Sequence, residues 1–259
     1  MAQAGKPLLW GQMTWQDVRD VRSAGLDMAI LPVGSTEQHG PHLPLETDTT
    51  LAEAVAREVS ARTGVVVLPT LPYGCALGHT RHWPGTLSLS PQVLGAVVCE
   101  VLEDAIAYGF TRLLILSGHL TNEAPLRSAL ELLRQRHPHL QIAQKHLLEA
   151  SQRTHDAYFE DAQDLHANSA ETALMQHLTP ELVRDDLIFD DPDRTGELFF
   201  SYTVPFTSLA GHTGFPSRAT PQLGAQLFEM LVEDWSRQVL VALKEEPPLR
   251  PTLGQTEKP

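Results

Sequence analysis

The stretch at residues 30–50, ILPVGSTEQHGPHLPLETDTT, concentrates side chains of the types that bind divalent metals. Glu37, His39 and Asp48 follow a short apolar run within a dozen positions. Carboxylate oxygens and imidazole nitrogens together suit zinc, manganese or iron. Glu37 and His39 stand two positions apart, and residues at this spacing at the end of a strand point to the same side. The pattern predicts a metal site, with a surface loop rich in Glu and His as the alternative.

Two later segments carry further candidate ligands. His119 comes directly after the apolar run RLLILS and Gly118, a position that suits either a ligand or a structural histidine. The segment LHANSAET contains His166 and Glu171, where Asn168 and Glu171 also fit a helix-capping pattern. Asp48 has a similar alternative, because it stands just before an expected helix and could serve as its N-cap.

The stretch GHTRHWPGT at residues 78–86 lies in a long loop rich in Gly, His and Pro. Loops of this length inside a compact domain tend to be functional or disordered, and the apolar and aromatic residues here favour order. We expect His79, His82 and Trp83 to line the wall of a pocket. A further segment, Gly211-His-Thr-Gly, has glycines that permit unusual turns.

Apolar runs alternate with helical patterns along the chain. This alternation predicts an α/β fold with three α/β/α layers, in which a mostly parallel sheet carries helices on both faces. Ligands of such sheets bind beyond the carboxyl ends of the strands, where the first motif and His119 would both lie. The expected strands are residues 28–33, 65–69, 112–117 and 141–147, and the expected helices are 14–25, 50–62, 90–108, 124–136, 169–178 and 220–244.

The bulk composition narrows the functions open to the chain. The 259 residues include 19 Lys and Arg against 32 Asp and Glu, a formal charge of −13. This charge argues against binding to nucleic acids or anionic membranes, which need clustered basic side chains. With two cysteines, no signal-peptide core and no apolar run near the ~20 residues that span a bilayer, we expect a cytoplasmic protein. We expect one domain over residues 1–246 and a disordered tail over residues 247–259.

Taken together, these motifs resemble the creatininase family of metal-dependent amidohydrolases. PVGSTEQHGPHLPLETDT matches the first motif of that family closely, and the similarity continues over most of the chain. The later matches are individually less specific. They are HWPGTLSLS to the Pro-Gly-Thr loop, LILSGHLTN to the Gly-His motif, LHANSAETALM to the segment that ends in Glu-Thr, and GHTGFPSRATPQLG to the segment before the last helix.

The resemblance implies a fold, a chemistry and a set of ligands. Family members have one α/β domain with a Rossmann-like layered core and commonly form hexamers. They bind two divalent metals, for which we expect zinc first, with manganese and iron as alternatives. They hydrolyse C–N bonds in small cyclic amides, formamides or small peptides, by attack of a metal-bridging hydroxide. By motif match, Asp48 corresponds to the bridging ligand and His166 to the proton shuttle. The other corresponding ligands are Glu37, His39 and His119.

The chain departs from creatininase proper at one position of the Gly-His motif. Creatininase has a glutamate ligand two residues after the histidine, and this chain has Thr121, which we place among the substrate-binding residues. The departure weakens creatinine as the substrate. Two dications carry four positive charges, whereas Glu37, Asp48 and a hydroxide supply three negative ones. Glu171 is therefore our candidate for a third carboxylate ligand.

Other functions remain open at this level. The same fold permits a metal-binding protein without catalysis, and a peptidase-type or formamide-cleaving member of the family is an alternative to a cyclic amidohydrolase. A serine nucleophile has little support, because Ser35 and Ser117 lack a Gly-x-Ser-x-Gly elbow. No phosphate-binding glycine motif is present.

Overall fold

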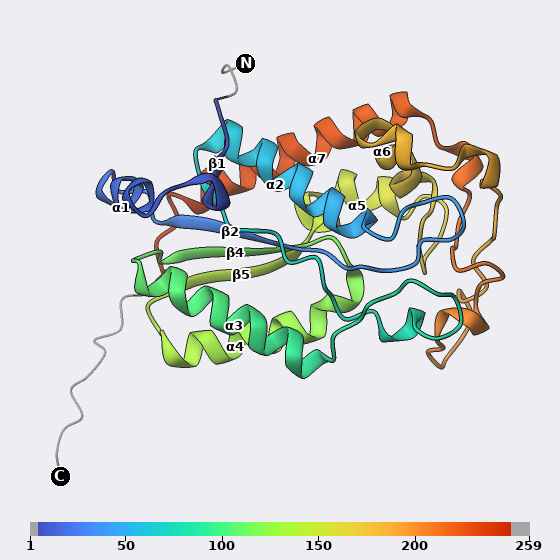
Figure 1. Cartoon of the computed structure of the whole chain (residues 1–259), viewed down its shortest axis with the longest axis horizontal. Helices are drawn as coiled ribbons and strands as arrows, with labels where there is room; N and C mark the ends of the chain where they lie inside the picture. The colour runs from blue at the N-terminus through green and yellow to red at the C-terminus, as the bar shows by residue number, and fades with distance from the viewer. Residues whose placement is uncertain (1–4, 250–259) are drawn as a thin grey trace, which may run out of the picture.

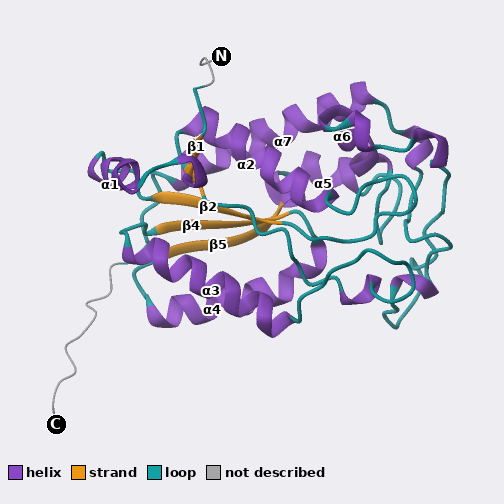
Figure 2. Ribbon diagram, in the orientation of Figure 1, coloured by secondary structure: helices purple, strands orange, loops and turns teal. Residues whose placement is uncertain are grey.

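Within residues 5–249, which the computed structural model describes, five parallel strands form a central sheet (Figure 1). The strands follow the order β1-β3-β2-β4-β5 across the sheet. Figure 2 shows the loops that extend from one end of the strands into a large irregular region. The strands are β1 (Leu8–Leu9), β2 (Met28–Val33), β3 (Val66–Val67), β4 (Arg112–Ser117) and β5 (Gln141–His146).

Helices cover both faces of the sheet, as Figure 1 shows, with α2 and α7 on one face and α3 and α4 on the other. This arrangement confirms the predicted α/β fold with helices on both sides of a parallel sheet. The helices are α1 (Trp15–Ser23), α2 (Thr47–Thr63), α3 (Pro91–Ala107), α4 (Glu123–Arg136), α5 (Gln152–Tyr158), α6 (Ser169–Leu178) and α7 (Pro221–Ala242).

The sheet has a hydrophobic core on each face, and the two cores follow from the alternation of side chains along β2 and β4. Ile30, Leu114 and Leu116 point into the core that contains α2, α6 and α7. Leu31 and Ile115, one position away, point into the core that contains α3 and α4. Because successive residues of a strand face opposite sides, a strand between two helical layers must be apolar at every position, as β2 is.

Most elements expected from the sequence are present close to their predicted bounds. Expected strands 28–33 and 112–117 coincide with β2 and β4, and expected helix 169–178 coincides with α6. Helix α1 begins with the predicted capping box between Thr14 and Asp17. The expected strand at 65–69 shortens to the two residues of β3, and the prediction missed β1, α5 and several short 3-10 helices.

The carboxyl ends of β2 and β4 lie side by side, since Val33 pairs with Ser117 in the parallel ladder. A glycine follows each strand at once. A Cβ on Gly34 would lie 2.3 Å from Oγ1 of Thr49, and one on Gly118 would lie 2.2 Å from the carbonyl oxygen of Asp48. These two glycines therefore allow the first turn of α2 to press directly against both strand ends, which brings Asp48 into the space beyond them.

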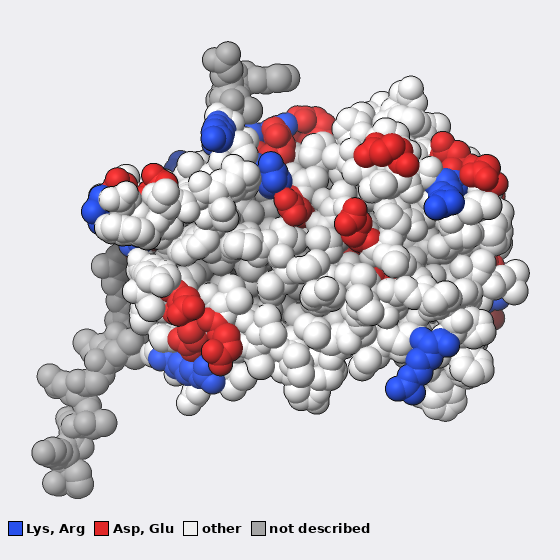
Figure 3. Space-filling view, in the orientation of Figure 1, with Lys and Arg blue, Asp and Glu red and all other residues white. Residues whose placement is uncertain are grey.

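The surface carries acidic and basic side chains in small separate groups on the face shown in Figure 3. Among the described residues, none of the helices is both long enough and apolar enough to cross a membrane. Of the predicted tail, residues 247–249 are irregular in structure, and residues 250–259 lie outside the described part of the chain.

Candidate metal centre

Six of the predicted site residues converge beyond the ends of β2 and β4. They form three overlapping groups whose nitrogen or carboxylate oxygen atoms lie within 4.8 Å of one another. The members come from segments that are far apart in the sequence, and all are buried or nearly so. The groups are Glu37, His39 and His166; Glu37, Asp48 and His119; and His39, Asp48 and Glu171.

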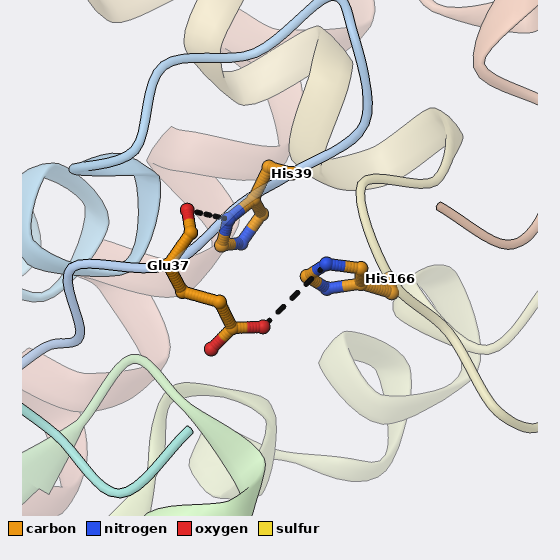
Figure 4. Close-up of side chains that lie close together, drawn as sticks. All are labelled: Glu37, His39 and His166. Carbon is orange, nitrogen blue, oxygen red and sulfur yellow. Dashed lines mark hydrogen bonds and ion pairs between the residues drawn. The ribbon is translucent and has the colours of Figure 1, made fainter. Parts of the chain in front are cut away.

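Glu37 and His39 enter the site from the loop after β2, opposite His166, as Figure 4 shows. Nδ1 of His39 lies 3.0 Å from the carbonyl oxygen of Glu37 and donates its proton there, which leaves Nε2 to face the site. That nitrogen lies 3.2 Å from Oδ1 of Asp48. A hydrogen bond from the ring nitrogen that does not bind the metal is the usual way in which proteins orient a metal-binding histidine.

Asp48 is the one residue that the group with His119 and the group with Glu171 have in common. It lies in the first turn of α2, whose N-cap is Glu46 and not Asp48. The alternative role of Asp48 as an N-cap is therefore wrong. The Asp48 carboxylate instead faces two imidazoles: Oδ1 faces His39, and Oδ2 lies 3.2 Å from Nδ1 of His119. A carboxylate with one oxygen toward each group is suited to bridge two cations.

Three buried oxygen atoms in the centre have no hydrogen-bond partner among the described residues: both carboxylate oxygens of Glu37 and Oδ2 of Asp48. Yet Nδ1 of His119 lies only 2.9 Å from one Glu37 oxygen. Donors that share a metal ion at about 2.0–2.2 Å, at angles of about 90–110°, are about 2.8–3.6 Å apart. The residues thus fit a divalent cation, because their nitrogen and oxygen atoms lie at the separations of ligands that share one ion.

The buried acids and imidazoles perturb one another strongly. Burial would raise the pKa of Asp48, but the neighbouring His39 and His119 lower it to about 2. Burial would lower the pKa of His39, but Asp48, Glu37 and the more distant Glu171 raise it to about 10. The imidazoles of His119 and His79 likewise overcome burial and hold the pKa of Glu37 well below its ordinary value. The buried carboxylates of Glu37 and Asp48 are stable in their charged form only when positive charge lies beside them.

Glu171 lies in the first turn of α6, where its backbone N–H donates to the side chain of Asn168, as in a capping pattern. Its carboxylate does not complete that pattern. Oε2 instead accepts a hydrogen bond of 2.6 Å from the backbone of Ala167. Burial, with the nearby Asp48 carboxylate, raises the pKa of Glu171 to about 7 against the effect of His39. The carboxylate is thus held beside His39 and Asp48 as a candidate third acidic ligand.

Nε2 of His166 faces the site. It lies 2.8 Å from the backbone carbonyl oxygen of Gln38 and 3.5 Å from Oε1 of Glu37. Burial, followed by the neighbouring His39 and His79, holds the pKa of His166 well below its ordinary value. The ring is therefore neutral near pH 7 and able to take up a proton, which suits a general acid–base role.

Gln38, which the sequence reasoning missed, connects several of these side chains. Its amide nitrogen lies 3.0 Å from Nδ1 of His79, 3.2 Å from Nε2 of His166 and 2.8 Å from the carbonyl oxygen of Gly211. The position of Gln38 between Glu37 and His39 was the only indication in the sequence. Gly211 has φ 83°, and a Cβ there would lie 2.0 Å from the Gln38 side chain, so this turn requires glycine.

The residues predicted for the pocket wall separate into two sets. Nδ1 of His79 lies 3.0 Å from Oε1 of Glu37, directly beside the candidate ligands. His82 is exposed and packs edge-on against Trp83, with ring centroids 4.5 Å apart. Among the described residues, neither His82 nor Trp83 forms a hydrogen bond or ion pair with the candidate ligands. Thr121 lies next to it and contacts His119.

Comparison with known proteins fits this geometry. The sequence model of the family described as creatinine amidohydrolase matches residues 11–239. The chain belongs to the creatininase family. Creatinine amidohydrolase of Pseudomonas putida is 27% identical over 260 residues, which cover 94% of this chain and 98% of that protein. The mycofactocin precursor peptide peptidase of Mycobacterium ulcerans (strain Agy99) is 33% identical over 218 residues, which cover 79% of this chain and 81% of that protein.

A solved structure of mutant creatininase, described as "Zn-Zn type", superposes with a TM-score of 0.80 at 27% identity. It covers 91% of this chain and 98% of that one. The creatininase fold therefore extends over nearly the whole described chain. The family resemblance drawn from the motifs is confirmed, and these relatives include both a small-molecule amidohydrolase and a peptidase.

Proposed function

We propose that the protein is a metal-dependent amidohydrolase that cleaves a C–N bond in a small cyclic amide, a formamide or a related substrate. The observation that carries this proposal is the set of unpartnered, fully buried oxygens of Glu37 and Asp48 among imidazole nitrogens. Buried carboxylates are costly without positive charge beside them, and a divalent cation would supply that charge in place of the protons on the imidazoles. The hexamer and the preference for zinc stay predictions from the family resemblance, and the cytoplasmic location stays a prediction from the composition of the sequence.

The chain would hold two divalent ions, with Asp48 shared between them. Glu37 and His119 would complete one site, and His39 and Glu171 the other, in line with the groups of side chains that lie together. When bound, such a pair of ions lowers the pKa of a water and polarises an amide carbonyl. The protein would fix these ligands through Asp48 at the start of α2 and through the backbone contacts of His39.

His166 would move the proton that the reaction requires. Its neutral Nε2 is directed at the centre and lies within reach of Glu37 and the Gln38 carbonyl. In this role His166 delivers the proton on its Nε2 to the departing nitrogen and regains one from the attacking water, because an amine leaves readily only when protonated. The Gln38 carbonyl, which can only accept, would orient the neutral ring with its proton on Nε2.

A peptide is the second candidate substrate, for two reasons. The peptidase of Mycobacterium ulcerans has the higher sequence identity to this chain of the two relatives above. Large apolar side chains are also exposed near the centre, with Leu77 and Phe206 on two short 3-10 helices, η2 (Leu77–His79) and η7 (Val204–Phe206), that lie against each other. Such a surface suits an extended substrate with apolar side chains better than a small polar ring.

A substrate panel tests the proposal. Purified protein, reconstituted with zinc, manganese or iron, is assayed on cyclic amides, formamides and short peptides, with chelator-treated protein as the control. The proposal predicts that at least one C–N substrate is hydrolysed and that the activity depends on metal. Stoichiometric metal binding without turnover on any of the three classes would instead favour a non-catalytic metal-binding protein.

A further inference from the structure

The hydroxyl group of Thr121 lies between the imidazole of His119 and the backbone of Cys75. Oγ1 of Thr121 is 2.6 Å from the Cys75 carbonyl oxygen and 2.5 Å from Nε2 of His119. Thr121 stands two positions after His119, in the short 3-10 helix η3 (Leu120–Asn122) that follows the end of β4 at Ser117. The other ring nitrogen of His119 is the one that faces the carboxylates of Glu37 and Asp48.

The direction of these hydrogen bonds follows from the number of protons. A hydroxyl group has one hydrogen, and a carbonyl oxygen can only accept. The hydroxyl of Thr121 therefore donates to the Cys75 carbonyl and accepts from the N–H at Nε2 of His119. The Cys75 carbonyl also lies 3.2 Å from Nε2, as a second acceptor for the same proton. His119 must then carry its proton on Nε2 when neutral, which leaves the lone pair of Nδ1 directed at the carboxylates.

We propose that Thr121 is a positioning residue that fixes the tautomer and the ring orientation of His119, so that Nδ1 is presented to a divalent cation. The inference rests on the proposed function only in that it assumes a cation beside Glu37 and Asp48. Hydrogen bonds to the outer nitrogen of a ligating histidine raise its basicity and order its ring, and losing one typically weakens metal binding about 10–100-fold.

The Cys75 carbonyl is held in place independently of Thr121. The neighbouring residue Asn122 accepts a hydrogen bond of 2.8 Å from the backbone N–H of Cys75 through Oδ1. Its amide nitrogen donates to the carbonyl oxygen of Gly34 at 2.9 Å. This buried side chain thus anchors the 71–90 loop to the ends of β2 and β4. Removal of the Thr121 hydroxyl would leave the carbonyl acceptor where it is, so its effect falls on His119 alone.

The same geometry distinguishes this role from the substrate contact predicted for Thr121. The single proton of the hydroxyl is used by Cys75, and one acceptor position is used by His119. Thr121 therefore has no proton left to offer to a substrate carbonyl. The residue is also exposed, so valine, which removes the hydroxyl and keeps the branched side chain, can replace it outside the core.

The experiment compares Thr121→Val with Thr121→Ser in the full-length protein. The probe is Zn²⁺, titrated in competition with a chromophoric chelator, and unfolding temperatures verify that both variants fold. We expect Thr121→Val to weaken the binding of one of the two zinc ions at least about 10-fold. The loss should lie near the lower end of the range of about 10–100-fold, because the Cys75 carbonyl still accepts the proton of Nε2. Thr121→Ser should retain the wild-type zinc affinity. In the Zn²⁺-loaded wild type and Ser variant, long-range ¹H–¹⁵N spectra should show His119 protonated at Nε2.

Two results would overturn the proposal while leaving the metal centre intact. The first is a wild-type zinc affinity in Thr121→Val, and the second is a His119 proton on Nδ1. A raised KM at saturating zinc with unchanged zinc affinity would assign Thr121 to substrate binding instead. Failure of the wild-type protein to bind zinc, manganese or iron at all would contradict the proposed function itself, and is recognised before any variant is compared.

Discussion

Nδ1 of His119 lies 2.9 Å from Oε2 of Glu37 and 3.2 Å from Oδ2 of Asp48. Neither carboxylate oxygen has a well-aligned hydrogen-bond partner among the described residues, and an unpaired buried oxygen costs about 1–3 kcal/mol. The three atoms belong to one group of candidate ligands that lie within 4.8 Å of one another. This relationship is the clearest geometric sign of a cation site in the molecule, and the predictions below depend on it.

Asp48→Asn should abolish binding of both metal ions, because Asp48 is the one residue that the group with His119 and the group with Glu171 share. The amide has nearly the same shape as the carboxylate, so the protein should remain folded while it loses the shared negative charge. Metal content measured after dialysis should fall from about two ions per chain to almost none. The matched control is Glu46→Gln, two residues away on the exposed surface, where the side chain makes no cap hydrogen bond. Full metal occupancy in Asp48→Asn would show that Asp48 is not a bridging ligand.

Glu171→Gln should have a narrower effect. Glu171 shares a group with His39 and Asp48 but not with His119, so only one of the two sites should lose a ligand. We expect one ion per chain to remain tightly bound and the second to weaken about 10-fold or more. Titration of the metal-free variant with zinc measures the two affinities separately. Two ions bound with unchanged affinity would leave Glu171 as a capping residue of α6 and nothing more.

His166→Ala should separate chemistry from metal binding. The ring contacts Glu37 and Gln38, but its proposed task is to carry a proton, which contributes on the order of 10²–10⁴-fold to the rate. We expect two bound ions, an unchanged fold and a loss of turnover of that size on the substrate that the panel identifies. His155→Ala, at an exposed position on α5, serves as the control. Full activity in His166→Ala would remove the residue from the mechanism.

Metal uptake should release protons at pH 7. Without metals, Asp48 and Glu37 raise the pKa of His39 to about 10 against the effect of burial, and they raise that of His119 well above its ordinary value. Both imidazoles are therefore protonated at pH 7, and each must lose its proton to become a ligand. We expect at least about two protons released per chain, and weaker metal binding as the pH falls.

Calorimetric titration with zinc in two buffers of different ionisation enthalpy measures this release directly. The apparent binding enthalpy should change between the buffers in proportion to the number of protons. Glu171, whose pKa burial raises to about 7, should add part of a further proton. An enthalpy that is independent of the buffer would mean that His39 and His119 are already neutral before metal binds, contrary to the charge pairing in the centre.

The fold could be predicted largely from local patterns. The central strands β2 and β4 are apolar at nearly every position, which marks strands buried on both faces, and α3 and α7 begin at Ser-Pro and Thr-Pro pairs that cap a helix. Because sheets of this class place ligands at the carboxyl ends of the strands, the neighbourhood of Glu37 and His119 also followed from the sequence. The short strand β1 could not be predicted, since two residues form no period.

The finer contacts of the centre could not be predicted, because they depend on backbone atoms and on turns. The hydrogen bond from His39 to the Glu37 carbonyl, and the one from Thr121 to the Cys75 carbonyl, involve oxygens that every residue has. Gln38 contacts Gly211, 173 positions away, through a turn that only the folded chain defines. A sequence pattern can identify metal-binding side chains, but it cannot show which backbone groups orient them.

The most direct measurement is anomalous diffraction from crystals of the zinc-loaded protein, collected on both sides of the zinc absorption edge. We predict two anomalous peaks that share Asp48 as a ligand, one beside Glu37 and His119 and the other beside His39 and Glu171. Well-ordered crystals grown with excess zinc that show no anomalous peak among these side chains would contradict the proposed metal centre.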